Sequence, residues 1–477
     1  MISGAAHRFL FLAAILVAGV YCAAAASKTW PIIDGDGPAY FPAAVEWSLG
    51  HPLTNPVWLP PLDDSIDGPG GRRFTYHGFV YARVVGGMAH LIGGGAEATV
   101  AVAYLFHWLA AVAAAFAVRA WLPHDSRVRW LTPLLPLTML AVSVSTHGRV
   151  ESMAVLVVSM VVLAWRCAWP PVREMFAGAG VALLTFTSPA CGVVGACALA
   201  AALAHTDRRT GARVAAAVVG GAVAAGVVIW SYPYPIADWI TGVVRHSRIN
   251  VALPPGQGFV TTWVRAAELP LLIVTVGVVA GSAAIYARAL APSLMHTRRI
   301  VFTLAVLAFA AGLTRVAFVK TEAFYNAVVW LPLLGALAVA TRARMAGAVA
   351  LGVALVLPVV GLVRSSVVLA HQFRTGAVTF AEVRDVMTAL PGGEFSVTGG
   401  LWLAVDLPAS AVFTTRDRPE RRFFVLQQVN TGQTTPPAID GYAVRLDRFG
   451  RGARVLGIPV SRTGGGWNFA VYEQAGE

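Results

Sequence analysis

Charged side chains are scarce in this chain, and lysine is nearly absent. Only 13% of its 477 residues are charged, whereas 57% are hydrophobic, and the only lysines are Lys28 and Lys320. This composition excludes an ordinary soluble protein and is typical of a polytopic membrane protein. The formal net charge is still +12. Because most of the basic excess lies among the apolar segments before residue 364, it indicates membrane topology and lipid contact, and it argues against a nucleic-acid partner.

Cysteine is also rare, and its positions exclude two kinds of site. The four cysteines, Cys22, Cys167, Cys191 and Cys197, lie in or beside apolar segments. Their spacing matches neither a zinc site nor a disulfide framework. We expect them to be small buried apolar side chains, with a Cys191–Cys197 pair as the alternative.

A cluster of carboxylates gives one candidate for a metal site. Asp63, Asp64 and Asp67 precede a Gly-Pro-Gly-Gly run and offer the oxygen ligands that hard cations prefer. The spacing is not that of an EF-hand, and a solvated loop is the favoured interpretation. No cofactor is therefore assigned, and a divalent cation stays open as an alternative.

Apolar segments long enough to enter a bilayer recur through the first three quarters of the chain. The first, from Phe9 to Ala26, predicts an uncleaved membrane helix, with a secretory signal as the alternative. Together with the later segments it predicts about eleven spans. The later spans are expected at 97–121, 131–146, 152–166, 175–188, 189–205, 213–230, 269–287, 300–316, 324–340 and 346–363.

The arginines between the spans predict the orientation. Alternate short connections carry arginine pairs or triplets, such as Arg208, Arg209 and Arg213, on the same side as Arg8. The positive-inside rule puts that side in the cytoplasm. An odd number of spans then puts the long connection 27–96 and the C-terminus outside.

From about residue 364 the composition becomes that of a folded soluble domain. We expect an α/β domain at 364–477, following a membrane module at 1–363. Residues 379–390 predict a capped amphipathic helix. Short β-rich runs predict strands at 394–398, 411–415, 423–428, 458–462 and 468–472.

The segment 31–50, PIIDGDGPAYFPAAVEWSLG, contains the main catalytic candidates. Asp34 and Asp36 lie just after the first apolar segment, where an acid is unfavourable unless a polar pocket holds it. An amphipathic run at 39–49 follows, and a second one at 76–92 fits an interfacial helix. The tryptophans nearby, Trp30 and Trp47 among them, and also Trp239, are explained by an aromatic belt.

Four motifs resemble those of the GT-C superfamily of polyprenyl-phosphate-sugar-dependent membrane glycosyltransferases, including its aminoarabinose and mannosyl transferases. They are Asp36-Gly-Pro-Ala-Tyr40 followed by Ala43-Ala44 and Gly50; residues 76–93; Gly148-Arg149-Val150-Glu151; and Thr187-Ser188-Pro189. Val150 replaces a proline of the superfamily, and Ser188 replaces a lysine. The matches fall within residues 1–205.

The resemblance implies a helical membrane module with a small outer α/β domain, and an inverting transfer on the outer side of a bacterial inner membrane. In such enzymes an acid near the outer surface takes the proton of an acceptor hydroxyl. The resemblance assigns this role first to Asp36 and then to Asp34; either residue could instead cap the following helix. The expected partners are a polyprenyl-phosphate-linked sugar donor, an acceptor that is a glycan, lipid or protein, and the bilayer.

The leaving phosphate needs cationic or polar groups close to the membrane surface. The candidates for binding the donor phosphate or sugar are Tyr40, Arg149, Glu151, Arg245, His246, Arg248, Lys320 and Tyr325. A solvated or snorkelling arginine is the alternative for each basic residue.

Two other functional classes remain open. A transporter or flippase of lipid-linked material should show repeated topology and charges at the membrane midplane. Here the charges gather at helix ends and the two halves of the chain do not match, which favours the enzyme. A non-catalytic relative of the GT-C enzymes is the third hypothesis, because two motifs are altered.

Overall fold

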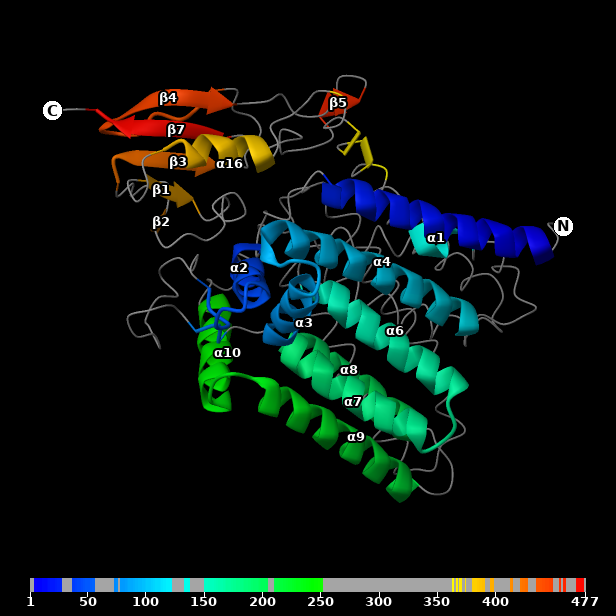
Figure 1. Cartoon of the computed structure of the whole chain (residues 1–477). Coiled ribbons are helices and arrows are strands. Elements are labelled where there is room, and N and C mark those ends of the chain that lie inside the picture. The colour runs from blue at the N-terminus through cyan, green and yellow to red at the C-terminus, as the bar shows by residue number, and fades with distance from the viewer. Residues whose placement is uncertain are drawn as a thin grey trace.

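The computed structural model (Figure 1) describes residues 4–27, 37–55, 73–75, 78–121, 133–137, 150–204 and 210–251 of the membrane module. In the C-terminal region it describes 380–390, 395–398, 412–414, 421–427, 435–448, 454–455, 458–459 and 469–475, with a few residues between 363 and 374. The spans expected at 269–287, 300–316 and 324–340 lie outside these ranges, as does all but the last residue of 346–363.

Within the described residues, three helices are long and apolar enough to cross a membrane. They are α1 (Gly4–Ser27), α4 (Gly95–Trp121) and α9 (Thr210–Ser231). α6 (Glu151–Cys167) and α8 (Pro189–Ala204) are apolar but shorter, and α7 (Val172–Thr187) lies between them. The helices expected at the first segment and at 97–121, 152–166, 175–188, 189–205 and 213–230 are thus confirmed as helices.

Most of the apolar helices pack against helices that are close to them in the sequence, and α7 contacts three of them. α4 contacts α1 and α6, and α7 contacts α6, α8 and α9 (Figure 1). α7 and α9 approach closely because glycine removes a side chain: a Cβ atom on Gly178 would overlap the carbonyl oxygen of Ala217, and one on Gly220 would overlap that of Met175. Small residues at helix crossings replace the hydrophobic driving force that lipid cannot supply.

The first long connection folds against one end of this bundle as two short helices. α2 (Gly37–Ser48) and α3 (Phe79–His90) match the amphipathic runs expected at 39–49 and 76–92. They cross where Gly86 meets the backbone carbonyl of Ala44. The Gly95 amide, at the start of α4, donates to the Ser48 hydroxyl at 2.8 Å, and the His90 ring contacts the Ser48 carbonyl at 2.8 Å. These bonds fix the ends of α2, α3 and α4 together.

A further amphipathic helix, α10 (Ile236–Val251), follows α9. The spans expected from the sequence leave residues 231–268 as a connection without a membrane helix. Its apolar positions recur at helical spacing, and Asp238 lies in its first turn, where the helix dipole favours an acid.

The C-terminal region is an α/β unit, as expected. α16 (Phe380–Thr388) accompanies a five-stranded sheet of order β2-β1-β3-β7-β4 (Figure 1). The strands are β1 (Phe395–Thr398), β2 (Val412–Thr414), β3 (Phe423–Gln427), β4 (Tyr442–Arg448) and β7 (Phe469–Gln474), with a separate pair β5 (Arg454–Val455) and β6 (Ile458–Pro459). β1 runs parallel to β2 and β3, and β7 runs antiparallel to β3 and β4.

One ion pair joins this unit to the membrane helices. Arg384 of α16 lies 3.4 Å from Glu97, in the first turn of α4. The contact is at the same end of α4 that holds α2 and α3. The α/β unit therefore lies at the end of the bundle that carries the first long connection.

Candidate functional site

The residues singled out by the sequence fall into two groups. Asp34, Asp36, Arg149, Lys320 and Tyr325 lie outside the described residues. Tyr40 is described in full and is completely buried. The backbone is described for Glu151 at the start of α6 and for Arg245, His246 and Arg248 in α10.

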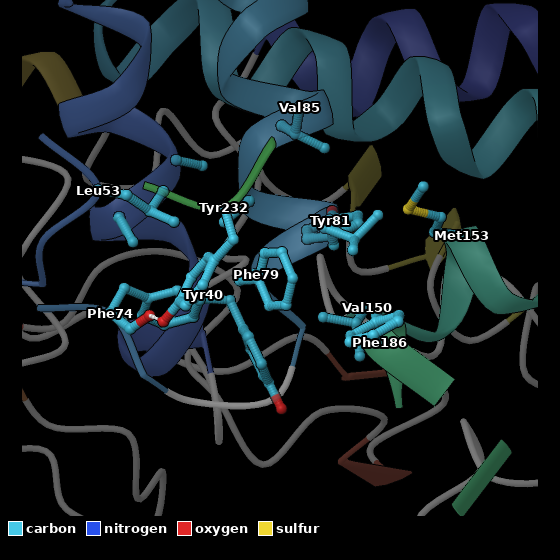
Figure 2. Packing of buried hydrophobic residues seen from close by; sticks show 14 of the residues in the cluster. Tyr40, Leu53, Phe74, Phe79, Tyr81, Val85, Val150, Met153, Phe186 and Tyr232 are labelled. Atoms are coloured by element: carbon cyan, nitrogen blue, oxygen red, sulfur yellow. Dashed lines mark hydrogen bonds between the residues drawn. The ribbon is translucent and has the colours of Figure 1, made fainter. Parts of the chain in front are cut away.

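Residues that belong to the candidate motifs, or lie next to them in the sequence, meet at one point of the fold. Gly78 has a positive φ of 91°, and a Cβ atom there would lie 2.5 Å from Val150 and 2.9 Å from the Tyr40 ring. The Gly78 amide donates to the Phe186 carbonyl at 3.4 Å. Figure 2 shows Tyr40, Val150 and Phe186 within a single cluster. The start of α2, the entry to α3, the start of α6 and the end of α7 therefore converge.

This junction joins segments that contain or adjoin the candidate motifs. Tyr40 belongs to the motif that begins at Asp36, and Val150 lies between Arg149 and Glu151. Phe186 directly precedes Thr187 and the rest of the Thr-Ser-Pro motif. Motifs that are far apart in the sequence thus have members or immediate neighbours packed against one another.

Aromatic rings from α3, α7 and the segment after α9 line the same junction. Phe79 lies 4.3 Å from Tyr232 and 5.9 Å from Trp239, measured between ring centroids, and Phe186 lies 5.0 Å from Trp239. Only 7% of Trp239 is exposed. The expectation that Trp239 belongs to an aromatic belt facing lipid is therefore wrong: its ring packs inside the protein and attaches α10 to the junction.

Hydrogen bonds tie the remaining ends of the first connection to the segment after α9. The Tyr232 hydroxyl donates to the Phe74 carbonyl at 2.8 Å, and the Tyr234 hydroxyl donates to the Leu53 carbonyl at 2.9 Å. Burial raises the pKa of Tyr232 well above its usual range, so this hydroxyl keeps its proton and remains a donor. The segments at 53 and 74 also pair with each other, through the Phe74 amide and the Leu53 carbonyl at 2.9 Å.

An ion pair adds to this attachment. Arg73 Nη1 lies 2.9 Å from Asp238 Oδ2, and the guanidinium stands 5.3 Å from the centre of the Tyr234 ring. Asp238 also lies in the first turn of α10, so its charge is favourable to that helix as well. α10 is therefore held to the first connection by an aromatic ring, an ion pair and a close backbone contact at Gly242 and Thr75.

Three side chains around the junction carry buried polar atoms that have no hydrogen-bond partner within the described part of the chain. They are Thr187 Oγ1, Trp239 Nε1, and the Nε and Nη1 atoms of Arg83. Thr187 is fully buried, and Arg83 lies one turn along α3 from Phe79. A buried donor without a partner is costly, so such groups are candidates for binding a ligand.

No group of three or more histidine, cysteine or acidic residues in the described ranges could hold a metal ion. Asp63, Asp64 and Asp67, the candidate cation ligands, lie outside those ranges. Cys22, Cys191 and Cys197 are free thiols, which agrees with the expectation that they are not disulfide-bonded.

The sequence interpretation missed the contribution of residues 232–239, YPYPIADW. The signal was a dense run of aromatic residues followed by an amphipathic pattern with an acid in its first turn. Their partners, Leu53, Phe74, Phe79 and Phe186, are distant in sequence, so the pairing is visible only in the fold. Comparison of the chain with family models, with curated proteins and with solved structures finds no match.

Proposed function

We propose that the protein is an inverting glycosyltransferase of the bacterial inner membrane, built on about eleven membrane spans. It transfers one sugar from a polyprenyl phosphate to an acceptor on the outer surface, which is a glycan, a lipid or a protein. Asp36 is the general base, and Asp34 is the second candidate.

The reaction is a single displacement. The carboxylate accepts the proton of the acceptor hydroxyl, whose oxygen attacks the anomeric carbon and forms the new glycosidic bond. The bond between the anomeric carbon and the phosphate oxygen breaks, and polyprenyl phosphate leaves with the bonding electrons. Cationic and N–H groups at the outer surface stabilise the charge that gathers on the leaving phosphate.

The observation that carries the proposal is the convergence at Gly78. A catalytic site assembled from the motifs at residues 36–50, 76–93, 148–151 and 187–189 requires that these segments meet. Gly78 is the point of contact: Tyr40 and Val150 lie against the position where its Cβ atom would be, and its amide bonds to Phe186. Phe186 directly precedes its motif.

The polar atoms at this junction also suit a sugar substrate. Trp239 Nε1 is a buried donor on a ring that packs against Phe79 and Phe186, and Thr187 Oγ1, on the residue after Phe186, is buried as well. Sugars present hydroxyl groups at their edges and C–H groups on their faces, so sites for them combine polar atoms with aromatic rings.

The position of the α/β unit agrees with the proposed orientation. It contacts Glu97 at the end of the bundle where the candidate motifs meet. The arginines Arg166, Arg173 and Arg213 lie at the opposite helix ends. By the positive-inside rule that opposite end is cytoplasmic, which puts the junction and the α/β unit outside.

The test compares purified full-length wild type with Asp36→Asn and Asp34→Asn, each supplied with radiolabelled polyprenyl-phosphate sugars and membrane extract as the acceptor source. Loss of the base should slow transfer by about 10²- to 10⁴-fold. Asp440→Asn is the matched control, because Asp440 is an exposed carboxylate in the α/β unit. We expect it to transfer at the wild-type rate.

Three outcomes would change the proposal. Full transfer by Asp36→Asn, Asp34→Asn and their double variant would remove the catalytic assignment. Loss of transfer in Asp34→Asn alone would exchange the two roles. The transporter would be favoured if no donor gave transfer and the reconstituted protein moved a fluorescent lipid-linked sugar from one leaflet of the vesicle membrane to the other.

A further inference from the structure

A buried carboxylate holds two arginines at the end of the bundle opposite the junction. Glu174, fully buried in the first turn of α7, accepts a hydrogen bond of 2.9 Å from Arg173 Nε through its Oε1 atom. The same oxygen lies 3.7 Å from Nε of Arg213, near the start of α9. α7 and α9 pack side by side and begin at the same end (Figure 1). The two guanidinium groups are therefore neighbours at the start of two adjacent helices.

The charges of this described cluster do not cancel, because two arginines share one carboxylate. Both arginines approach Glu174 through Nε, and Glu174 Oε2 has no hydrogen-bond partner within the described part of the chain. Neither guanidinium is thus bidentate on the carboxylate. Each keeps the pair of Nη groups at its tip, whose parallel N–H bonds match two oxygens of a phosphate.

The two arginines are held in place by the protein. Only 21% of each side chain is exposed. The Arg173 guanidinium also stacks on Trp165 of α6, 5.0 Å from the centre of a ring, so a third helix fixes its plane. A snorkelling arginine, in contrast, extends its head group freely into water. Because Arg173 and Arg213 are already ordered, an anion that binds them restricts few further side-chain rotamers.

Exposed apolar side chains beside the pair favour an anion that carries acyl chains. Phe176 lies one turn after Arg173 on α7, Val218 lies beyond Arg213 on α9, and both are exposed. Trp169, between α6 and α7, is 74% exposed. Tryptophan is enriched at the membrane–water interface, whereas exposed apolar faces lie in hydrocarbon. The arginines therefore lie at the depth of lipid phosphates.

We infer that Arg173 and Arg213 together bind the phosphate of an anionic phospholipid, whose acyl chains lie along Phe176 and Val218. The proposed orientation puts this end of the bundle in the cytoplasm, so the lipid belongs to the inner leaflet. Basic pockets between membrane helices on that side bind anionic lipid head groups. A lipid held by both arginines bridges α7 and α9 and stabilises their contact. The inference does not depend on sugar transfer.

The test measures lipid binding to the full-length protein. Delipidated protein in an uncharged detergent is titrated with dioleoyl phosphatidylglycerol, and native mass spectrometry gives the dissociation constant of the first bound lipid. Dioleoyl phosphatidylethanolamine has the same chains and a phosphate, but its amine cancels the negative charge. We expect it to bind wild type at least about tenfold more weakly.

Arg213→Met is the main variant. It should weaken the binding of phosphatidylglycerol by at least about tenfold, because one charge-assisted bidentate pair is lost. Arg213→Lys keeps the charge but loses the fork, so an intermediate loss is expected. Arg173→Met should weaken binding as much, but it also removes the 2.9 Å hydrogen bond to a buried carboxylate, so we expect it to be less stable.

Arg119→Met is the matched control. Arg119 lies in the last turn of α4, whose first turn is at the junction end, so it stands at the same end of the bundle as Arg173. Its guanidinium carbon is 4.8 Å from the centre of the Phe11 ring, at the contact of α1 with α4. This variant loses the same charge at the same membrane surface, away from α9, and we expect it to bind as wild type does.

Three results would overturn the inference. Equal binding of phosphatidylglycerol by wild type and Arg213→Met would show that the pair does not hold the lipid. Equal losses in Arg213→Met and Arg119→Met would show that only the general surface charge matters. Glycerol 1-phosphate, a head group without chains, should compete poorly, and strong competition would assign the site to a soluble phosphate instead.

Thermal unfolding in the same detergent gives a second measurement and checks that each variant is folded. Saturating phosphatidylglycerol should raise the unfolding temperature of wild type more than that of Arg213→Met, because a ligand stabilises the state that binds it. An equal rise in both would contradict a lipid bridge between α7 and α9. Neither measurement uses sugar transfer, so the lipid site and the proposed enzyme can fail separately.

Discussion

Glycine residues determine how closely the segments of the candidate site approach one another. Gly78 combines two requirements, since its φ of 91° is strained for other residues and its Cβ position is already occupied by Val150 and Tyr40. Gly93 has a similarly positive φ of 111°, but no atom lies within 4 Å of its Cβ position. Replacing Gly93 therefore introduces backbone strain alone, whereas replacing Gly78 introduces both strain and overpacking.

Gly78→Ala should reduce both stability and transfer. Strain at a positive φ costs about 1–2 kcal/mol, and overpacking adds about 1–3 kcal/mol. Gly93→Ala should show the strain alone and keep the wild-type transfer rate. Thermal unfolding in detergent and the transfer assay measure the two effects. Equal losses in the two variants would show that contact with Val150 and Tyr40 contributes nothing.

At the scale of elements, the short helices were predictable because their patterns are local. α2, α3 and α16 are amphipathic with a helical period, and the structure confirms them within a few residues of the expected bounds. β4 was missed, although it has seven residues. It is the edge strand of the described sheet, next to β7, and exposed residues such as Val444 keep it from showing the alternation of a half-buried strand.

The site itself was predictable only in part. A motif marks residues whose types suit a reaction, and four such segments were identified before the fold was known. The role of Trp239 could not be inferred, because it depends on contacts with Phe79 and Phe186 on other helices. The roles of Asp36 and Arg149 stay predictions, because these residues lie outside the described part of the chain.

The position of α10 depends on how closely α7 and α9 pack. α9 ends at Ser231, immediately before the tyrosines that bond to the first connection. Its other end is fixed by Glu174, which is fully buried and whose Oε1 lies 2.9 Å from Arg173 Nε and 3.7 Å from Arg213 Nε. A change in the separation of α7 and α9 should therefore move Tyr232 and Trp239 away from the junction.

Gly220→Ala should separate these helices, because the added Cβ atom would overlap the carbonyl oxygen of Met175. We expect a loss of about 1–3 kcal/mol in stability and slower transfer. Gly226→Ala is the control in the same helix, since no atom lies within 4 Å of its Cβ position. Alanine has the better helix propensity by about 1 kcal/mol, so this variant should be neutral or more stable. If the unfolding temperature shifted in the same direction in both variants, the close contact of α7 and α9 at Gly220 would not be what limits stability.

At the scale of the whole molecule, exposed apolar surface marks helix faces that suit lipid, and the ion pair to the α/β unit places that unit at one end of the bundle. The outer faces of α1 and α9 are covered with exposed apolar side chains, including Leu16, Val20, Val223 and Val227. Water disfavours such a surface, whereas hydrocarbon accommodates it. The Arg384–Glu97 pair then places the α/β unit at the end of the described bundle opposite Arg166, Arg173 and Arg213.

Cysteine accessibility tests the proposed orientation, because no native cysteine lies between residues 364 and 477. Asp440→Cys introduces a thiol at an exposed position of the α/β unit, and Ala212→Cys introduces one at an exposed position in the first turn of α9. A membrane-impermeant maleimide added to intact spheroplasts should label Asp440→Cys but label Ala212→Cys only after the membrane is permeabilised. Wild type measures the background from the native cysteines, of which Cys22 and Cys191 are buried and Cys197 is half-buried. Labelling of Ala212→Cys alone in intact spheroplasts would invert the protein and put the candidate site in the cytoplasm. Labelling of both would show that the α/β unit and the start of α9 share one side, which contradicts a membrane crossing by α9.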